Sequence, residues 1–193
     1  MQKGNQKLHA LARISKYMTF EKRKLIMKTF VESQFNYCPL VWMFHNRTLN
    51  HKINRMHERA LRVVYQNEDL SFQELLNIDN TPTIHQKNLR KLATEMYKVK
   101  NNLSPSPVVE LFINHTDSYN LRNRRCWEHP NTRTVAYGTE TISYRGPKTW
   151  ELIPRNIKDS STLAEFKHKI KQWLPDSCEC RLCKVFIHHL GYI

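Results

Sequence analysis

Four side chains of the kinds that bind zinc lie close together near the C-terminus: Cys178, Cys180, Cys183 and His188. Three thiolates and one imidazole would give Zn²⁺ the four ligands of a tetrahedral structural site. The spacing therefore predicts a zinc site, although the single residue between Cys178 and Cys180 is fewer than the usual two and forces those thiolates together. The alternative is a set of free thiols in a terminal segment.

A second pattern consists of cations at helical spacing. Lys52, Arg55, Arg59 and Arg62 recur at intervals of three, four and three residues, which places them on one face of a helix. Such a face can lie along a nucleic-acid backbone and contact several phosphates. The alternative is a solvated face, because Glu58 stands four residues before Arg62, at a spacing that favours an ion pair.

Lysines repeat this pattern on another predicted helix, where Lys87, Lys91 and Lys98 lie beside an apolar face. Two basic helices in one chain favour phosphate contact over a merely solvated surface. We therefore expect Lys87 and Lys91 to bind nucleic acid together with the first four cations.

Arginines and aromatic residues are interleaved between residues 119 and 150. Arginines bind phosphates, and aromatic rings can stack on nucleobases with about 1–3 kcal/mol for each base. We expect the arginines to contact the ligand and the aromatic residues Tyr144 and Trp150 to belong to the core. The predicted contacts in this segment are Arg122, Arg124, Arg125 and Arg145.

No catalytic constellation accompanies these basic residues. The sequence contains no adjacent pair of aspartates, no glycine-rich phosphate loop, no nucleophile elbow and no HExxH zinc motif. Cys38 and Cys126 have His45 and His129 nearby in sequence, but nothing in the pattern marks an activated nucleophile. We expect the chain as given not to be an enzyme.

The composition agrees with a polyanionic partner. The 193 residues include 31 Lys and Arg against 17 Asp and Glu, a formal net charge of +14, and such an excess favours attraction to nucleic acid. The alternative is a basic protein whose charge only keeps it soluble. No apolar run approaches the ~20 residues that span a bilayer, and neither a secretory signal nor a disulfide framework is evident. We expect no membrane partner and an intracellular location, in the nucleus or the cytoplasm.

The elements that must position these residues are mainly helices. Apolar residues recur at intervals of three and four, and capping residues precede several of these segments at Thr19, Ser71 and Thr162. The predicted helices span residues 19–34, 48–66 and 83–102, with a short helix after Ser71 and a last one from 163 that ends at Pro175. The pattern predicts a mainly α chain.

Two shorter segments are less regular. Residues 37–44 are mostly apolar and predict a buried helix entered through Pro39, whereas residues 139–144 predict a short strand. In the helix after Thr19, the residues expected to face the core are Phe20, Met27, Phe30 and Val31. In the helix 48–66 they are Leu49, Ile53, Met56, Ala60, Val63 and Val64.

Several blocks of the sequence resemble one family. Residues 33–42 (SQFNYCPLVW) and 53–62 (INRMHERALR) resemble the region after the catalytic palm in reverse transcriptases of jockey-like LINE (non-LTR) retrotransposons. Residues 119–122 (YNLR) and 138–150 (GTETISYRGPKTW) are similar to a block of their C-terminal tail, and residues 178–193 are similar to the end of such proteins. The blocks stand in the family's order, and the resemblance covers nearly the whole chain.

The resemblance implies a thumb, the helical bundle that grips the template–primer duplex, followed by a tail. The fingers, the palm and its paired aspartates have no counterpart in the sequence, so we expect a non-catalytic fragment of an RNA-directed DNA polymerase. The implied organisation is a thumb-like bundle in residues 1–66, a helical extension in 67–104, and a less regular, basic region in 105–193 with a terminal helix and a cysteine-rich tail.

Two functions follow as expectations. The first is binding of RNA or of an RNA–DNA duplex through backbone phosphates. The second is a protein-interaction or structural role, in which the basic faces dock acidic partners or the missing palm. The surroundings of Arg55 and Arg59 separate the two, because side chains held in a protein groove or paired with carboxylates would not reach a phosphate.

Overall fold

The computed structural model describes residues 2–44, 47–114, 126–134 and 138–173. These residues are mainly helical, as the sequence predicts, and within them the only β pairing is a bridge between Asn114 and Trp127. The chain divides into two compact units, residues 1–87 and 88–193. Residues 67–87, which the sequence analysis assigned to a helical extension, pack with the first unit, whose core includes Leu75 and Ile84.

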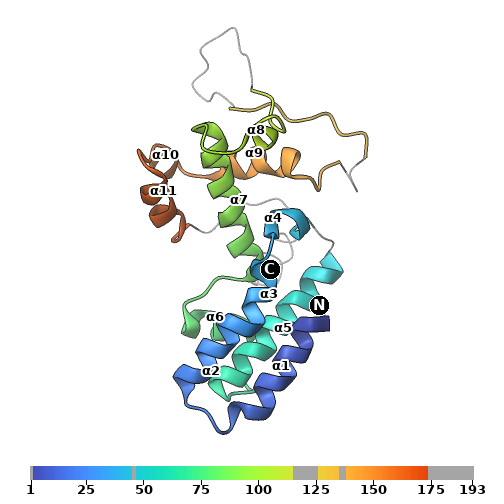
Figure 1. The fold of residues 1–193 in the computed structure, drawn as a ribbon, viewed down its shortest axis with the longest axis vertical. Coiled ribbons are helices and arrows are strands. Elements are labelled where there is room, and N and C mark those ends of the chain that lie inside the picture. Colours follow the sequence, from blue (N-terminus) through green and yellow to red (C-terminus); the bar gives the residue numbers. More distant parts are fainter. Residues whose placement is uncertain (1, 45–46, 115–125, 135–137, 174–193) are drawn as a thin grey trace, which may run out of the picture. The chain divides into compact units, whose positions relative to one another are not determined.

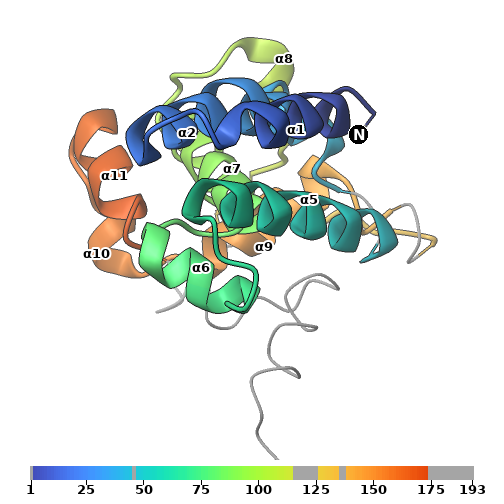
Figure 2. The same ribbon diagram turned by 90° about the horizontal axis from the view of Figure 1, so that it is seen from below.

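The first unit is a bundle formed by α1 (Gln2–Ser15), α2 (Phe20–Ile26), η1 (Met27–Glu32), α3 (Ser33–Asn36), α4 (Pro39–Trp42), α5 (Arg47–Tyr65) and α6 (Phe72–Asp79). Helices α1 and α5 lie side by side and run in the same direction (Figures 1 and 2). Gly4 permits this close approach, because a Cβ there would lie 2.9 Å from Sδ of Met56.

The apolar face of α5 forms the middle of this core. Ile53, Met56, Ala60 and Val64 are buried, as their spacing predicts, while Leu49 and Val63 are only partly buried. Leu61 is fully buried as well, so the buried face is wider than predicted. Because one face of α5 is buried along most of its length, the orientation of the helix is fixed. The same residues therefore always form its exposed face.

The predicted helix after Thr19 changes its winding midway, from α2 through the π-helical turn η1 into α3. A π turn bonds residues five apart instead of four. Met27 and Val31 are buried as predicted, but Phe20 and Phe30 are 36% and 55% exposed, so the prediction was wrong for the two phenylalanines. With the wider turn, residues three apart no longer share a face, and Glu32 lies inside instead.

The apolar segment 37–44 is not a buried helix, since it forms only the single turn of α4. Cys38 has a left-handed backbone, with a φ of 42°, and separates α3 from α4. One turn cannot present a continuous apolar face. Tyr37 and Val41 are therefore 79% and 81% exposed, and Met43 is buried.

Two polar side chains tie the helices of the first unit together. Buried Arg23 donates from Nε to the Val64 carbonyl (2.9 Å) and from Nη1 to that of Met18 (2.8 Å), and so bonds a carbonyl that the end of α5 leaves without a helical donor. Asp79 accepts from Lys24 (2.7 Å) and Tyr65 (2.8 Å). Burial alone would raise the pKa of Asp79, but these bonds outweigh it, and the pKa lies below its usual value.

The second unit has an aromatic core. Its helices include most of α7 (Ile84–Lys100), of which residues 88–100 belong to this unit, together with α8 (Ser106–Val109), α9 (Ile142–Leu152), α10 (Arg155–Lys158) and α11 (Leu163–Ile170). Trp150 is buried, as predicted, and its ring centroid lies 5.7 Å from that of Trp127 and 6.0 Å from that of Phe166. Tyr144 is only partly buried.

The strand predicted for residues 139–144 does not form, because helix α9 begins at Ile142. Gly146 and Pro147 lie inside this helix, where both residue types are intrinsically unfavourable. A Cβ at Gly146 would lie 2.6 Å from Sδ of Met96 and 3.0 Å from Phe112. The glycine therefore lets α9 pack closely on α7, and tertiary contact overrides the local preference.

Two of the three predicted capping residues, Ser71 and Thr162, cap their helices, whereas Thr19 stands at the start of α2 but its side chain makes no capping hydrogen bond. The Ser71 N–H donates to the Glu74 carboxylate (2.8 Å), and the Glu74 N–H donates to Oγ of Ser71 (3.3 Å), which completes the capping box. At α11, the Glu165 N–H donates to Oγ1 of Thr162 (3.2 Å), while the Glu165 carboxylate accepts from the N–H of Ser161 (2.9 Å). Both helices begin where the sequence predicts.

Candidate nucleic-acid interface

Three cations form an open basic face on α5. Lys52, Arg55 and Arg59 are exposed and lie opposite the buried face of the helix. No carboxylate of the described residues forms an ion pair with any of the three. At 1.5 Å per residue, the seven-residue step from Lys52 to Arg59 spans about 10 Å, so the three charges are spread along the helix rather than gathered at one point.

Arg62, the fourth predicted member of this face, is paired. Its Nη2 donates to the Glu58 carboxylate at 2.8 Å and to the Leu70 carbonyl at 3.3 Å. The i,i+4 pair that the sequence offered as an alternative therefore forms at this end of the stripe. We treat Lys52, Arg55 and Arg59 as the open basic face and Arg62 as its margin.

Helix α1 contributes further cations that sequence reasoning did not select. It lies along α5, and its sequence contains no acidic residue. Lys3 and Arg13 are exposed on α1, and Lys16 is exposed just after it. The absence of Asp and Glu from this helix is the signal that could have identified it. Together α1 and α5 give the first unit an excess of exposed positive charge.

Glu32, His57 and Lys87 form a polar cluster in the first unit, in which Glu32 and His57 are buried. Glu32 accepts from Nζ of Lys87 at 2.9 Å, and its other oxygen lies 3.6 Å from Nε2 of His57, beyond hydrogen-bond distance. Burial pushes the pKa of Glu32 upward, but the His57 ring and the Lys87 ammonium outweigh it and lower the pKa to about 2. Sequence spacing gave no signal for this cluster, because its members come from η1, α5 and α7.

The second predicted basic stripe, on α7, is therefore not an open face. Lys87 pairs with Glu32, Lys98 pairs with Glu95 at 3.0 Å, and Lys91 is partly buried. Cations that neutralise carboxylates of their own chain add little attraction for a phosphate. The structure gives no support to Lys87 and Lys91 as nucleic-acid contacts.

The remaining predicted contacts fall into two groups. Arg145 pairs with Glu140 and is partly buried, so it is not an open cation. Arg122, Arg124 and Arg125 lie outside the described residues, and so do the predicted zinc ligands Cys178, Cys180, Cys183 and His188.

The described residues contain no group arranged to bind a metal ion. Within residues 2–44, 47–114, 126–134 and 138–173, no group of three or more His, Cys, Asp or Glu side chains is arranged to hold a metal ion. Cys38 is exposed and Cys126 is partly exposed, and both are free thiols. His129 lies 3.2 Å from the Glu151 carboxylate. The open basic face is thus the most specific chemical feature of the described chain.

Comparisons with protein-family models, with curated proteins and with solved structures find no match. The resemblance to jockey-like reverse transcriptases therefore stays a prediction from the residues that carry it. Each helix in the described part of the chain is too short or too polar to cross a membrane.

Proposed function

We propose that the first unit binds an RNA or RNA–DNA duplex through its backbone phosphates, with Lys52, Arg55 and Arg59 of α5 as the principal contacts. One observation carries the proposal: these three cations are exposed, regularly spaced and without a carboxylate partner among the described residues, on a helix whose opposite face is buried. Cations held in this way keep their full charge for an external anion.

Affinity would arise largely from counterion release. Each phosphate that a Lys or Arg neutralises frees condensed cations, and log K falls with log salt by about 0.9 for each contact on a duplex. Three contacts therefore predict a slope of roughly −3, and cations of α1 would steepen it. Side chains that contact only the backbone do not read bases, so the affinity should be nearly independent of sequence.

A duplex is favoured over other polyanions for two reasons. The open face follows a straight helix over about 10 Å, which suits a regular row of phosphates. The likeness of residues 33–42 and 53–62 to the thumb region of jockey-like reverse transcriptases points to the same class of ligand.

The direct experiment is titration of a fluorescent RNA–DNA duplex with the whole chain at several salt concentrations. Arg55→Glu with Arg59→Glu should weaken binding by about 60-fold or more at 0.1 M salt, since two contacts of slope 0.9 are lost. The matched control is Lys22→Glu with Lys28→Glu, which changes the net charge equally at two exposed positions of α2 and η1. Equal losses for the two double variants would reduce the proposal to a nonspecific charge effect.

A second candidate function is docking of an acidic protein, and the exposed apolar residues of the first unit favour it. Tyr37 and Val41 are largely exposed, as is Leu25 at 61%, and such side chains are typical of protein interfaces. Competition separates the two functions. A polyglutamate chain of matched length should displace the duplex only weakly if phosphate geometry matters, and as well as unlabelled duplex if the face accepts any acidic polymer.

A further inference from the structure

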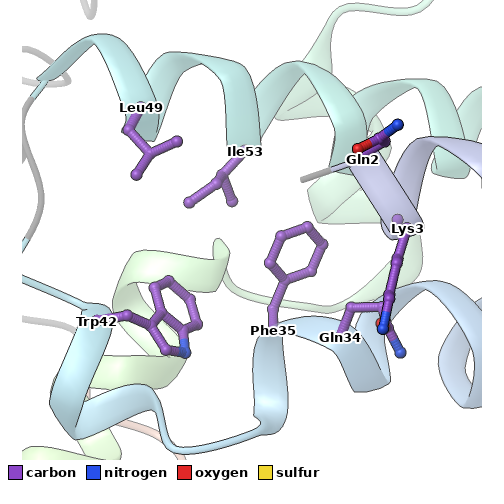
Figure 3. A pocket seen from close by; sticks show the side chains of 8 residues that line it. Gln2, Lys3, Gln34, Phe35, Trp42, Leu49 and Ile53 are labelled. Atoms are coloured by element: carbon purple, nitrogen blue, oxygen red, sulfur yellow. The ribbon is translucent and has the colours of Figure 1, made fainter.

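The first unit contains a pocket of about 440 Å³ that the basic face does not use. It lies where α1 and α5 begin, and its walls come from both helices and from α3 and α4 (Figure 3). This volume falls within the range of about 300–1,000 Å³ in which proteins bind small organic groups. The pocket is therefore large enough for a nucleobase.

The inner walls are apolar, and the two aromatic rings among them are tilted 60° to each other. Trp42 and Phe35 line one side, with ring centroids 6.3 Å apart, and Leu49 and Ile53 of α5 lie opposite them (Figure 3). The indole N–H of Trp42 donates to the Tyr37 carbonyl at 2.7 Å, which fixes the ring and satisfies its only donor. A fixed aromatic ring facing aliphatic side chains is a suitable site for stacking a planar base.

The rest of the lining is polar and basic. Gln2, Gln34 and Lys3 lie together at one end of the pocket (Figure 3). A glutamine amide both donates and accepts hydrogen bonds, as the edge of a base requires. None of the described residues that line the pocket is acidic, and neither α1 nor α5 has an acidic residue in its first turn.

The pocket and the open basic face share the first turns of α5 but involve different sides of that helix. Leu49 and Ile53 line the pocket, and Lys52 stands between them on α5. The first phosphate contact is therefore within one helical turn of the pocket wall. A strand whose backbone contacts Lys52 would have its end within one helical turn of the pocket along α5.

We propose that this pocket receives an unpaired nucleobase at the end of the duplex whose backbone contacts α5. The base stacks on Trp42 with its edge toward the tilted Phe35 ring, Gln2 and Gln34 meet its polar edge, and Lys3 meets the adjoining phosphate. The inference rests on the proposed function and adds to it a preference for duplexes with a single-stranded overhang.

The test compares a blunt RNA–DNA duplex with the same duplex carrying one unpaired 2-aminopurine nucleotide, at either end in separate probes. The full chain should bind one overhang probe about tenfold more tightly than the blunt duplex. The 2-aminopurine fluorescence should fall on binding, because a stacked base is quenched. Trp42→Ala should abolish both effects and leave the affinity for the blunt duplex unchanged.

Two further variants test whether a loss of the overhang preference in Trp42→Ala comes from the pocket rather than from misfolding. Leu49→Phe narrows the pocket without removing the Trp42 ring and should reduce the overhang preference to less than about threefold. Val41→Ala changes an exposed neighbour of Trp42 outside the pocket lining and should retain the full preference. Circular dichroism of each variant should match that of the parent chain.

The outcomes separate the two proposals. Equal, salt-dependent binding of blunt and overhang duplexes would overturn the pocket inference and leave the proposed function standing. Failure of both duplexes to bind would overturn both. An overhang preference that survives Trp42→Ala and Leu49→Phe would place the base elsewhere. Dimerisation in sedimentation that Trp42→Ala abolishes, with no overhang preference, would assign the pocket to a second copy of the chain.

Discussion

Helices α5 and α7 carry cations at nearly the same spacing, yet the two sets have different surroundings. Lys52, Arg55 and Arg59 of α5 are exposed, and no described carboxylate pairs with them. On α7, by contrast, Lys87 and Lys98 pair with Glu32 and Glu95. Spacing along a helix determines which side chains share a face. It does not determine whether a carboxylate pairs with those side chains. On α7, Glu95 of the same helix pairs with Lys98, and Glu32 from a distant part of the chain pairs with Lys87, so neither charge is available to a ligand.

The largest expected effect concerns the free energy of unfolding and tests whether the α7 lysine has a buried partner. Replacing Glu32 with alanine leaves the Lys87 ammonium without its partner next to buried His57. We expect the free energy of unfolding to fall by about 3 kcal/mol, measured by urea denaturation. The comparison variant Glu58→Ala removes the partly exposed Arg62 pair and should cost less than about 1 kcal/mol. Similar losses for the two would show that the α7 lysine is not held by a buried partner.

The same cluster predicts a pH dependence. The pKa of Glu32 is lowered from 4.5 to about 2 in the folded chain. The stabilisation is therefore complete above the unfolded pKa and is lost as the pH falls from about 4.5 towards 2, with a magnitude of about 3 kcal/mol. Urea unfolding between pH 6 and 2.5 should show a steeper fall for the parent chain than for Glu32→Gln. Parallel curves would contradict the ion pair, since Asp79 and Glu165 titrate equally in both proteins.

The next effect concerns binding and compares the two helices directly. Arg55→Ala with Arg59→Ala should weaken duplex binding by about 60-fold at 0.1 M salt, because two phosphate contacts are lost. Lys91→Ala with Lys98→Ala removes the same charge from α7 and should weaken it by less than about threefold. Fluorescence anisotropy with one duplex gives both values. A larger loss from the α7 pair would reverse the assignment of the interface.

The smallest expected effect is at the margin of the open face. Arg62 already pairs with Glu58 and with the Leu70 carbonyl, so Arg62→Ala should weaken duplex binding by less than about threefold. Arg59→Ala, one turn earlier on the same helix, should weaken it by about eightfold at 0.1 M salt. Equal losses in the same anisotropy assay would mean that Arg62 leaves its internal partners to contact the duplex.

Much of the fold follows from local signals in the sequence. The apolar spacing in residues 48–66 locates α5 to within a residue or two, and the capping residues Ser71 and Thr162 locate the starts of α6 and α11. The predicted end of the last helix at Pro175 was wrong, because α11 ends at Ile170. The predictions fail where tertiary contacts or a change in helix winding determine the local structure. Residues 139–144 have no helical pattern, yet α9 forms because Gly146 allows it to pack on Met96. The π turn η1 places Phe30 at the surface, and no local sequence pattern predicts that turn.

The candidate site was predictable only in part. The spacing of Lys52, Arg55 and Arg59 predicts a shared face of α5, on which the structure leaves all three exposed, and the i,i+4 rule identifies the Arg62–Glu58 pair. The pairing of Lys87 with Glu32 was not predictable, since the two residues are far apart in the chain and meet only through the bundle. The pocket near Trp42 was missed because residues 37–44 suggested a buried helix, whereas the short turn of α4 leaves that ring beside a cavity.

The salt dependence of duplex binding tests the central claim most directly. A plot of log K against log salt should have a slope of roughly −3 for the parent chain and should become shallower by about 2 in Arg55→Ala with Arg59→Ala. That change would count the phosphate contacts that the open face of α5 makes. An unchanged slope in the double variant would contradict the account, because the two arginines would then contact no phosphate.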